Sequence, residues 1–213
     1  MYIQITTRCN MSCAHCCFSC TSKGEDMKLR VFRTACKLAY EIGTSISLGG
    51  GEPTLHKHFW KFFGLALGST FDTWVWLATN GKRTEDALAL AIIGRQGVAS
   101  ISLSLDKYHE PIDPRVVSAF DKKDDRDPAD NRNIRTVNEV IAVGRASDWG
   151  TSDACRCNEL FVTPDGSVYV CGCLNKKLGH VFDTDIAQHI NEAQEEMEDH
   201  DCYTEYLRER ESR

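Results

Sequence analysis

The sequence predicts an α/β protein whose parallel strands form an incomplete TIM-like (β/α) barrel. Strand-like and helix-like segments alternate through the first two-thirds of the chain, which predicts a parallel sheet with helices on its outer face. The clearest strand, residues 100–105, places apolar side chains on one face and polar ones on the other, where Ser104 is followed by Asp106. Closed barrels have apolar interiors. A polar inner face therefore predicts a wider, incomplete barrel that holds a polar ligand.

The other elements of the predicted barrel follow from local patterning. Short runs rich in apolar, β-branched and aromatic residues predict strands, and the turn dipeptide Asn80-Gly81 ends one of them. Apolar residues at helical spacing predict the helices. The predicted strands cover residues 2–7, 45–48, 73–78, 100–105 and 140–143. The predicted helices cover residues 28–42, 56–67 and 84–93. About four to five parallel strands therefore fit before residue 150.

The character of the chain changes after residue 150. Residues 121–135, before this point, are dominated by charge and predict an exposed loop. Residues 160–163 and 167–170 flank Pro164-Asp165-Gly166, which predicts a β-hairpin. Residues 183–210 predict one long acidic helix or two shorter ones. We therefore expect a partial barrel over 1–150 and a small extension of hairpin plus helix over 151–213.

Composition limits the possible partners and the compartment. The 213 residues are 42% hydrophobic with a net charge of −6, which predicts a packed globular protein. No extended basic run is present, which argues against a nucleic-acid partner. No segment has the apolar length of a membrane span, and the N-terminus does not resemble a signal peptide. We expect a cytoplasmic protein without a membrane partner. Eleven cysteines in a reducing compartment favour metal or redox chemistry over disulfides.

Three cysteines directly after the first strand form the pattern C-x3-C-x2-C: Cys9, Cys13 and Cys16. Three thiolates can hold three irons of a four-iron cluster, which leaves the fourth iron open to a small molecule. A zinc site could use the same residues. Cys17 and Cys20 form an overlapping C-x2-C and are interpreted as neighbours of the cluster.

A second group of cysteines lies in the extension: Cys155, Cys157, Cys171 and Cys173. The predicted hairpin brings the two pairs together. Four thiolates can close around either a second four-iron cluster or one zinc ion.

The cysteine pattern, followed one strand–helix unit later by Gly50-Gly51-Glu52-Pro53, resembles the signature of the radical S-adenosylmethionine (SAM) superfamily. The resemblance implies a 4Fe-4S cluster at Cys9, Cys13 and Cys16 with SAM on its open iron. The reduced cluster would break the C–S bond of SAM, and the resulting 5′-deoxyadenosyl radical would take a hydrogen atom from substrate. By the same resemblance, Gly50, Gly51 and Glu52 bind the SAM amino group.

Further SAM contacts follow from the resemblance at the ends of the third and fourth strands. Ser104 and Arg115 are expected at the SAM carboxylate, Asp106 at the ribose, and Asn80 near the SAM site. A polar strand end or a turn asparagine explains the same residues without a ligand. His15 stands where the family commonly has an aromatic residue. It packs near adenine or is simply solvated.

The C-terminal region resembles the SPASM and twitch extensions of radical SAM enzymes through Gly144-Arg145-Ala146 and residues 162–171. This resemblance implies one auxiliary 4Fe-4S cluster and a peptide or protein substrate, modified in a maturase-type reaction. It also implies an electron donor such as flavodoxin or ferredoxin. Three alternatives stay open: a small-molecule or nucleotide-derived substrate, a glycyl-radical activase, and a non-catalytic structural or sensing protein that binds zinc or an iron–sulfur cluster.

Overall fold

The computed structural model describes residues 1–69, 74–121, 133–151, 159–174 and 176–196. The strands are β1 (Tyr2–Gln4), β2 (Ile46–Gly49), β3 (Val75–Thr79), β4 (Ser100–Ser104), β5 (Ile134–Arg135), β6 (Phe161–Val162), β7 (Ser167–Tyr169) and β8 (Lys177–His180). The α-helices are α1 (Leu29–Glu41), α2 (Phe59–Ser69), α3 (Thr84–Arg95), α4 (Pro114–Phe120) and α5 (Ile186–Glu196). Two 3-10 helices are η1 (Pro53–Leu55) and η2 (Gly144–Ala146).

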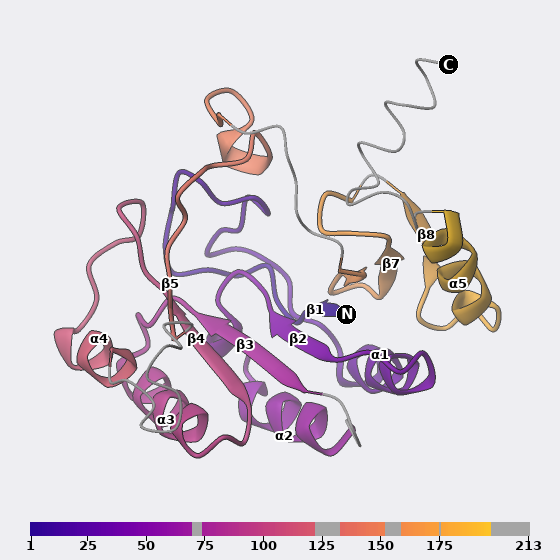
Figure 1. The fold of residues 1–213 in the computed structure, drawn as a ribbon, viewed down its shortest axis with the longest axis horizontal. Coiled ribbons are helices and arrows are strands. Elements are labelled where there is room, and N and C mark those ends of the chain that lie inside the picture. The colour runs from indigo at the N-terminus through magenta and orange to yellow at the C-terminus, as the bar shows by residue number, and fades with distance from the viewer. Residues whose placement is uncertain (70–73, 122–132, 152–158, 175, 197–213) are drawn as a thin grey trace.

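The strands of the described residues form one sheet in the order β5-β4-β3-β2-β1-β6-β7-β8 (Figure 1). Pairing is parallel from β5 through to β6, and antiparallel between β6, β7 and β8. The sheet is open rather than closed. This confirms the predicted α/β class and the incomplete barrel.

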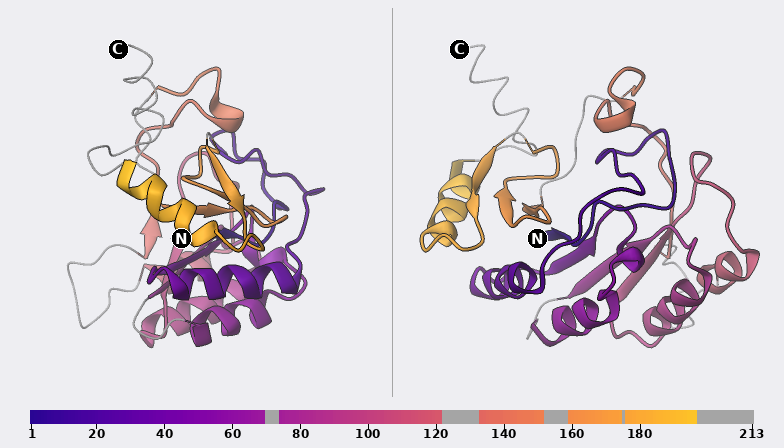
Figure 2. Two further views of the ribbon diagram at one scale, coloured as in Figure 1. Left: turned by 90° about the vertical axis from the view of Figure 1, so that its right-hand side faces the viewer. Right: turned by 180° about the vertical axis from the view of Figure 1, so that it is seen from behind.

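The C-terminal hairpin continues the sheet of the barrel. Strand β6 pairs with β1 in parallel register, with Tyr2 opposite Phe161 and Ile3 opposite Val162. Helix α5 follows β8 at the end of the sheet farthest from β5 (Figure 2). One hydrogen-bonded sheet thus spans both predicted regions, and the boundary at residue 150 stays a prediction.

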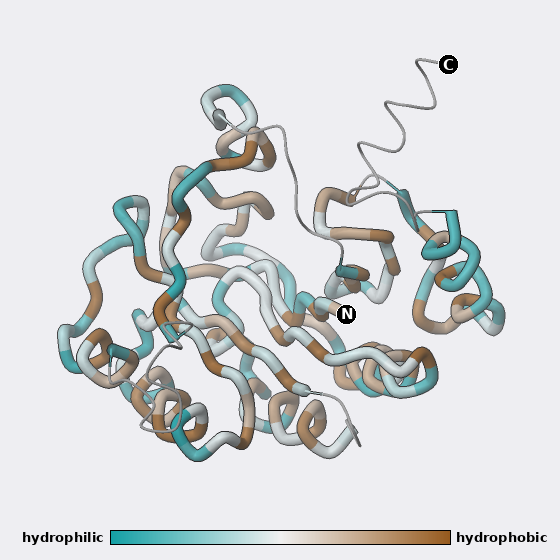
Figure 3. The backbone as a smooth tube through the Cα atoms, viewed as in Figure 1, coloured by the Kyte–Doolittle hydropathy of each residue, from teal (hydrophilic) through white to brown (hydrophobic). Residues whose placement is uncertain are grey.

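The apolar core lies between the sheet and helices α1, α2 and α3. These helices cover one face of the sheet, whereas the loop that follows β1 lies on the other side (Figures 1 and 2). Phe32 of α1 stacks on Phe62 of α2 with ring centroids 4.3 Å apart. Hydrophobic segments follow the strands and the helices that cover them (Figure 3). Gln4 of β1 and Ser102 of β4 are buried polar side chains next to the core residues Ile3 and Ile101. Because side chains alternate between the faces of a strand, Gln4 and Ser102 lie on the face opposite the core.

Several predicted elements differ from the structure. Residues 140–143 form no strand, and the strand beside β4 is instead β5, inside the stretch predicted as an exposed loop. Two residues are too few for the alternation that marks a strand in sequence. The helix predicted from residue 56 begins at Phe59, because η1 occupies the turn after Glu52. Helix α4, capped by Asp113, and strand β8 were not predicted. The acidic helix is present as α5, and residues 197–210 lie outside the described part of the chain.

No helix among the described residues reaches the length and apolar character that a bilayer-spanning segment requires.

We expect the stacked rings of Phe32 and Phe62 to contribute strongly to the stability of the fold. Replacing Phe32 by Ala leaves a cavity in a fully buried contact, so we expect a loss of about 3–5 kcal/mol in the free energy of unfolding. Urea unfolding followed by circular dichroism measures it. Tyr40→Ala, on the same helix but 63% exposed, is the control and should change stability by about 0.5 kcal/mol at most. Equal losses in the two variants would contradict the packing assigned to Phe32.

Candidate functional site

The cysteine loop after β1 is attached to the end of β2 through backbone hydrogen bonds. The Gly51 N–H donates to the Thr6 carbonyl at 2.8 Å, and the Glu52 N–H donates to the Arg8 carbonyl at 2.8 Å. A Cβ atom would lie 2.6 Å from the Thr6 oxygen at Gly50 and 2.4 Å from the Arg8 oxygen at Gly51. Only glycine fits this approach. The two glycines therefore set how closely the cysteine loop approaches the sheet.

The three cysteines of the predicted cluster are half-buried on this loop. The Met11 N–H donates to the Cys9 sulfur at 3.4 Å, and the Asn80 amide lies 3.7 Å from it. Burial raises the pKa of Cys9, and it raises the pKa of Cys13 to about 11 with help from the neighbouring thiolates. Hydrogen bonds from the Cys20 thiol and from the N–H groups of Cys20 and Phe18 lower the pKa of Cys16, and the charge of Arg145 adds to this effect.

The three cysteines of this loop supply the donor type that iron–sulfur clusters use, since such clusters are held by Cys thiolates. Ligands of one zinc lie at about 2.3 Å from the metal, and hence within about 4.6 Å of one another. Among the described residues, Cys9, Cys13 and Cys16 do not form a group whose donor atoms gather within 4.8 Å. The three sulfurs as they stand are therefore not arranged around a single ion.

Glu52 is buried, and its carboxylate joins the ends of β2 and β3. One oxygen accepts hydrogen bonds from the Thr54 hydroxyl at 2.6 Å and the Thr79 hydroxyl at 2.9 Å, and the other accepts from the Asn80 N–H at 2.7 Å. Burial raises the pKa of Glu52 even though these donors favour its charged form. The carboxylate is thus engaged with protein groups.

Asn80 links the end of β3 to the cysteine loop. Its side-chain amide donates to the Asn10 side chain at 2.9 Å, and its carbonyl accepts from the Lys82 N–H at 3.0 Å. The Lys82 ammonium donates to the Asn10 carbonyl and contacts the Glu110 carboxylate. Asn80 therefore lies beside Cys9, and its role at SAM stays a prediction.

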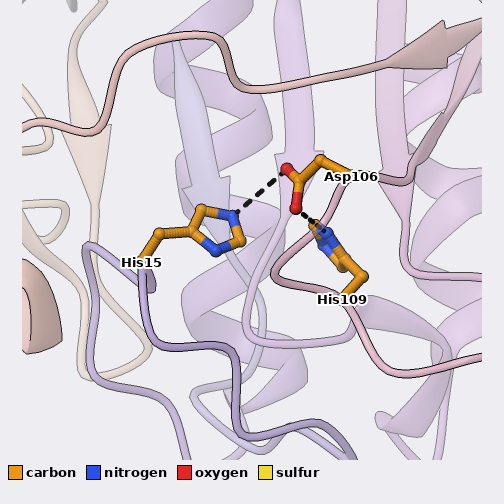
Figure 4. A group of neighbouring side chains, drawn as sticks. All are labelled: His15, Asp106 and His109. Carbon is orange, nitrogen blue, oxygen red and sulfur yellow. Dashed lines mark hydrogen bonds and ion pairs between the residues drawn. The ribbon is translucent and has the colours of Figure 1, made fainter.

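At the end of β4, Asp106 meets two histidines (Figure 4). One carboxylate oxygen accepts from the Tyr108 N–H and lies 2.9 Å from His109 Nδ1, and the other lies 3.6 Å from His15 Nε2. Burial opposes ionisation of Asp106, but the Tyr108 N–H and His109 outweigh it and lower the pKa of Asp106. His15 also packs on Tyr108, with ring centroids 4.9 Å apart.

Two polar atoms of this group are buried without a hydrogen-bond partner. They are Asp106 Oδ2 and His15 Nδ1. Buried polar groups are almost always paired with protein, water or a ligand. The end of β4 beside the cysteine loop therefore offers one acceptor and one imidazole nitrogen to a bound molecule. Sequence reasoning had placed Asp106 here but had not paired it with His15 and His109, which are distant in sequence or separated by a turn.

Other predicted residues are dispersed or untested. Arg115 is exposed, with its guanidinium 2.7 Å from Asp113 and 4.0 Å from Glu85, and the structure does not bring it to the other candidates. Ser104 ends β4, two residues before Asp106. Cys155 and Cys157 lie outside the described residues. Cys171 is buried and Cys173 half-buried after β7.

A cavity of about 590 Å³ lies between the cysteine loop and the C-terminal hairpin. Cys17 and Phe18 line it from the loop, and Cys173 lines it from the hairpin. Glu25 and Asp165 add two carboxylates. The two cysteines of the overlapping C-x2-C therefore have different surroundings. The Cys20 thiol hydrogen-bonds to Cys16, whereas Cys17 lines the hairpin cavity.

Comparisons with known proteins identify the family and the fold. The model described as "Radical SAM superfamily" matches residues 3–145. The crystal structure of BtrN in complex with AdoMet and 2-DOIA is similar with a TM-score of 0.63 and 17% identity, covering 91% of this chain and 84% of that chain. BtrN in an open conformation scores 0.54 at 16% identity, covering 91% and 82%. Streptococcus suis SuiB bound to the precursor peptide SuiA scores 0.49 at 12% identity, covering 89% and 63%, which is too low to support an inference. No protein of curated function matches the chain significantly.

The buried carboxylate of Glu52 predicts a pH-dependent contribution to stability. Glu52→Gln places an amide N–H₂ among N–H and O–H donors, so we expect a loss of about 1–3 kcal/mol in the free energy of unfolding. Because folding raises the pKa of Glu52 above its ordinary value of 4.5, the neutral form stabilises the fold. This stabilisation is fully present below pH 4.5 and is lost as the pH rises through the folded value. Urea unfolding across this range should show the advantage of wild type over the variant shrinking. An advantage that grows with pH would contradict the assignment.

Proposed function

Because the chain belongs to the radical SAM superfamily, we propose that Cys9, Cys13 and Cys16 hold the 4Fe-4S cluster with which this enzyme cleaves SAM. When bound, such a cluster supplies one electron to the sulfonium of SAM, and the resulting 5′-deoxyadenosyl radical removes a hydrogen atom from substrate. One observation carries the proposal. The half-buried cysteines lie at the same end of the sheet as two buried polar atoms that have no hydrogen-bond partner, Asp106 Oδ2 and His15 Nδ1.

The residues around the loop would hold SAM in distinct ways. The carbonyls of Gly50 and Gly51 accept from its amino group, and Glu52 shapes this turn from below. Asp106 Oδ2 accepts from a ribose hydroxyl, with His15 stacking nearby. Asn80 fixes the loop beside Cys9. Ser104 and Arg115 remain predictions as ligands of the SAM carboxylate, and Arg115 would have to leave Asp113 to act so.

A second, auxiliary 4Fe-4S cluster is proposed at Cys155, Cys157, Cys171 and Cys173, in a twitch-like extension over 151–213. Its support is the position of Cys171 and Cys173 directly after β7, on a hairpin that continues the sheet from β1. A cytoplasmic flavodoxin or ferredoxin would supply the electron, and plant-type ferredoxins have the low potential of about −400 mV that suits such a donor.

The substrate is proposed to be a peptide or protein that enters through the open side of the sheet. The cavity of about 590 Å³ also has the size of a small-molecule site, which spans about 300–1,000 Å³. It therefore favours a small molecule as the second candidate. Glu25 and Asp165 in its lining suit an amine or another cationic group in either case.

The two sets of cysteines predict separable losses in an anaerobically reconstituted protein. Replacing Cys9, Cys13 and Cys16 together by Ala should abolish formation of 5′-deoxyadenosine and remove about four irons per chain. Replacing Cys171 and Cys173 should remove a similar amount of iron while cleavage of SAM continues. Iron analysis and chromatography of 5′-deoxyadenosine measure both. Zinc in place of iron, or SAM cleavage by the triple variant, would overturn the proposed ligands.

Asp106 Oδ2 is buried without a hydrogen-bond partner, so we expect Asp106 to contribute to the affinity for SAM. Asp106→Asn removes a charged acceptor, and hydrogen bonds to charged groups contribute about 1.5–3 kcal/mol. We therefore expect the dissociation constant of SAM to rise at least tenfold, as measured by equilibrium dialysis of the cluster-loaded protein. Asp148→Asn is the matched control and should bind SAM as wild type does, because the Asp148 carboxylate accepts a hydrogen bond from the neighbouring Ser147 hydroxyl. Unchanged affinity in Asp106→Asn would contradict the placement of the ribose.

A further inference from the structure

Arg145 of η2 contacts the cysteine loop, although the two segments are far apart in sequence. Its guanidinium donates to the Cys13 carbonyl at 2.7 Å and to the Cys20 carbonyl. Its backbone N–H donates to the Cys16 carbonyl at 3.1 Å. One residue therefore binds three carbonyls of the loop. Two of these carbonyls belong to the proposed cluster ligands Cys13 and Cys16. The third belongs to Cys20, whose thiol hydrogen-bonds to the Cys16 sulfur.

The backbone next to Arg145 is shaped for this contact. Gly144 has φ +59°, and a Cβ atom there would lie 2.5 Å from the Cys16 carbonyl oxygen and 2.3 Å from that of Cys17. Trp149 donates its indole N–H to the Arg145 carbonyl at 3.2 Å. The segment after β5 thus packs directly on the cysteine loop, and any side chain at Gly144 would push it away.

The charge of Arg145 is unlike that of the other arginine beside the loop. Arg8 is neutralised by Asp26 at 2.7 Å. No carboxylate of the described residues forms an ion pair with Arg145, and its charge acts on the Cys16 thiol and on His15. Its hydrogen bonds go to neutral carbonyls, so within the described part of the chain its positive charge is not neutralised close to the proposed cluster.

We propose that Arg145 is a positioning residue that fixes the cysteine loop and raises the reduction potential of the SAM-cleaving cluster. Reduction adds one negative charge to a cluster, and cluster potentials respond to nearby charge and hydrogen bonds. An uncompensated cation stabilises the reduced form. This inference rests on the proposed cluster ligands and adds a role to a residue that touches neither SAM nor iron.

Four variants of the full chain separate the effect of the Arg145 charge from the effect of its hydrogen bonds to the cysteine loop. Arg145→Met removes both, and Arg145→Lys keeps the charge but loses the fork that spans two carbonyls. Gly144→Ala keeps the charge and disturbs the contact. Arg83→Met, at the N-cap of α3, is the control. The first readout is the midpoint potential of the cluster whose electron paramagnetic resonance signal changes on addition of SAM. The second is the rate of iodoacetamide alkylation of Cys13, Cys16 and Cys20 in the cluster-free protein.

We expect a more negative potential in Arg145→Met, a potential near wild type in Arg145→Lys, a smaller shift in Gly144→Ala than in Arg145→Met, and no change in Arg83→Met. Alkylation should be about tenfold faster in Arg145→Met and Gly144→Ala, since lost charge-assisted hydrogen bonds contribute about 1.5–3 kcal/mol. A wild-type potential in Arg145→Met, or an equal shift in Gly144→Ala, overturns the electrostatic role.

If Arg145→Met does not retain its cluster, Arg145→Lys and the alkylation rates decide. Rates equal to those of wild type in both Arg145 variants overturn the positioning role. Failure of the proposed function gives a different result, because a SAM-sensitive signal would then persist when Cys9, Cys13 and Cys16 are all replaced by Ala.

Discussion

The close contact between the cysteine loop and the end of β2 is the constraint on which the site depends. Gly50 and Gly51 have no Cβ, so their backbone can approach the Thr6 and Arg8 carbonyls and bond to the loop directly. Glu52 then ties this turn to the end of β3 through Thr79 and Asn80. Its burial would be unfavourable without these donors. The end of β2 thus holds the cysteine segment in place through backbone hydrogen bonds.

The electrostatics of the loop differ from one proposed cysteine ligand to the next. Burial and mutual repulsion raise the pKa of Cys9 and Cys13, so these thiols ionise readily only when a metal is bound. Cys16 is held in its thiolate-favouring state by donors from Cys20 and Phe18. Of the three proposed ligands, only Cys16 is thus favoured as a thiolate without a metal. The same loop is bounded by Arg145 on one side and by His15 and Asp106 on the other.

The C-terminal hairpin lies against the cysteine loop and lines one side of the cavity beside it. Because β6 pairs with β1, the hairpin begins next to the strand that leads into the cysteine loop. Phe18 of the loop packs on Phe161 of β6, with centroids 5.0 Å apart. The cavity between them is lined from both regions. A substrate bound in this cavity would contact both the family-matched segment and the C-terminal extension.

The sequence by itself determined the class of fold, the order of the first strands and helices, and the motifs of the family. These depend on periodicity and spacing within short windows, which the chain encodes locally. Only the tertiary structure decided which polar groups meet. It joined His15 to Asp106, turned Glu52 inward, left Arg115 on the surface with Asp113, and brought Arg145 to Cys13 across 132 residues. Contacts between residues so distant in sequence follow from strand order and packing, and neither is written in a local pattern.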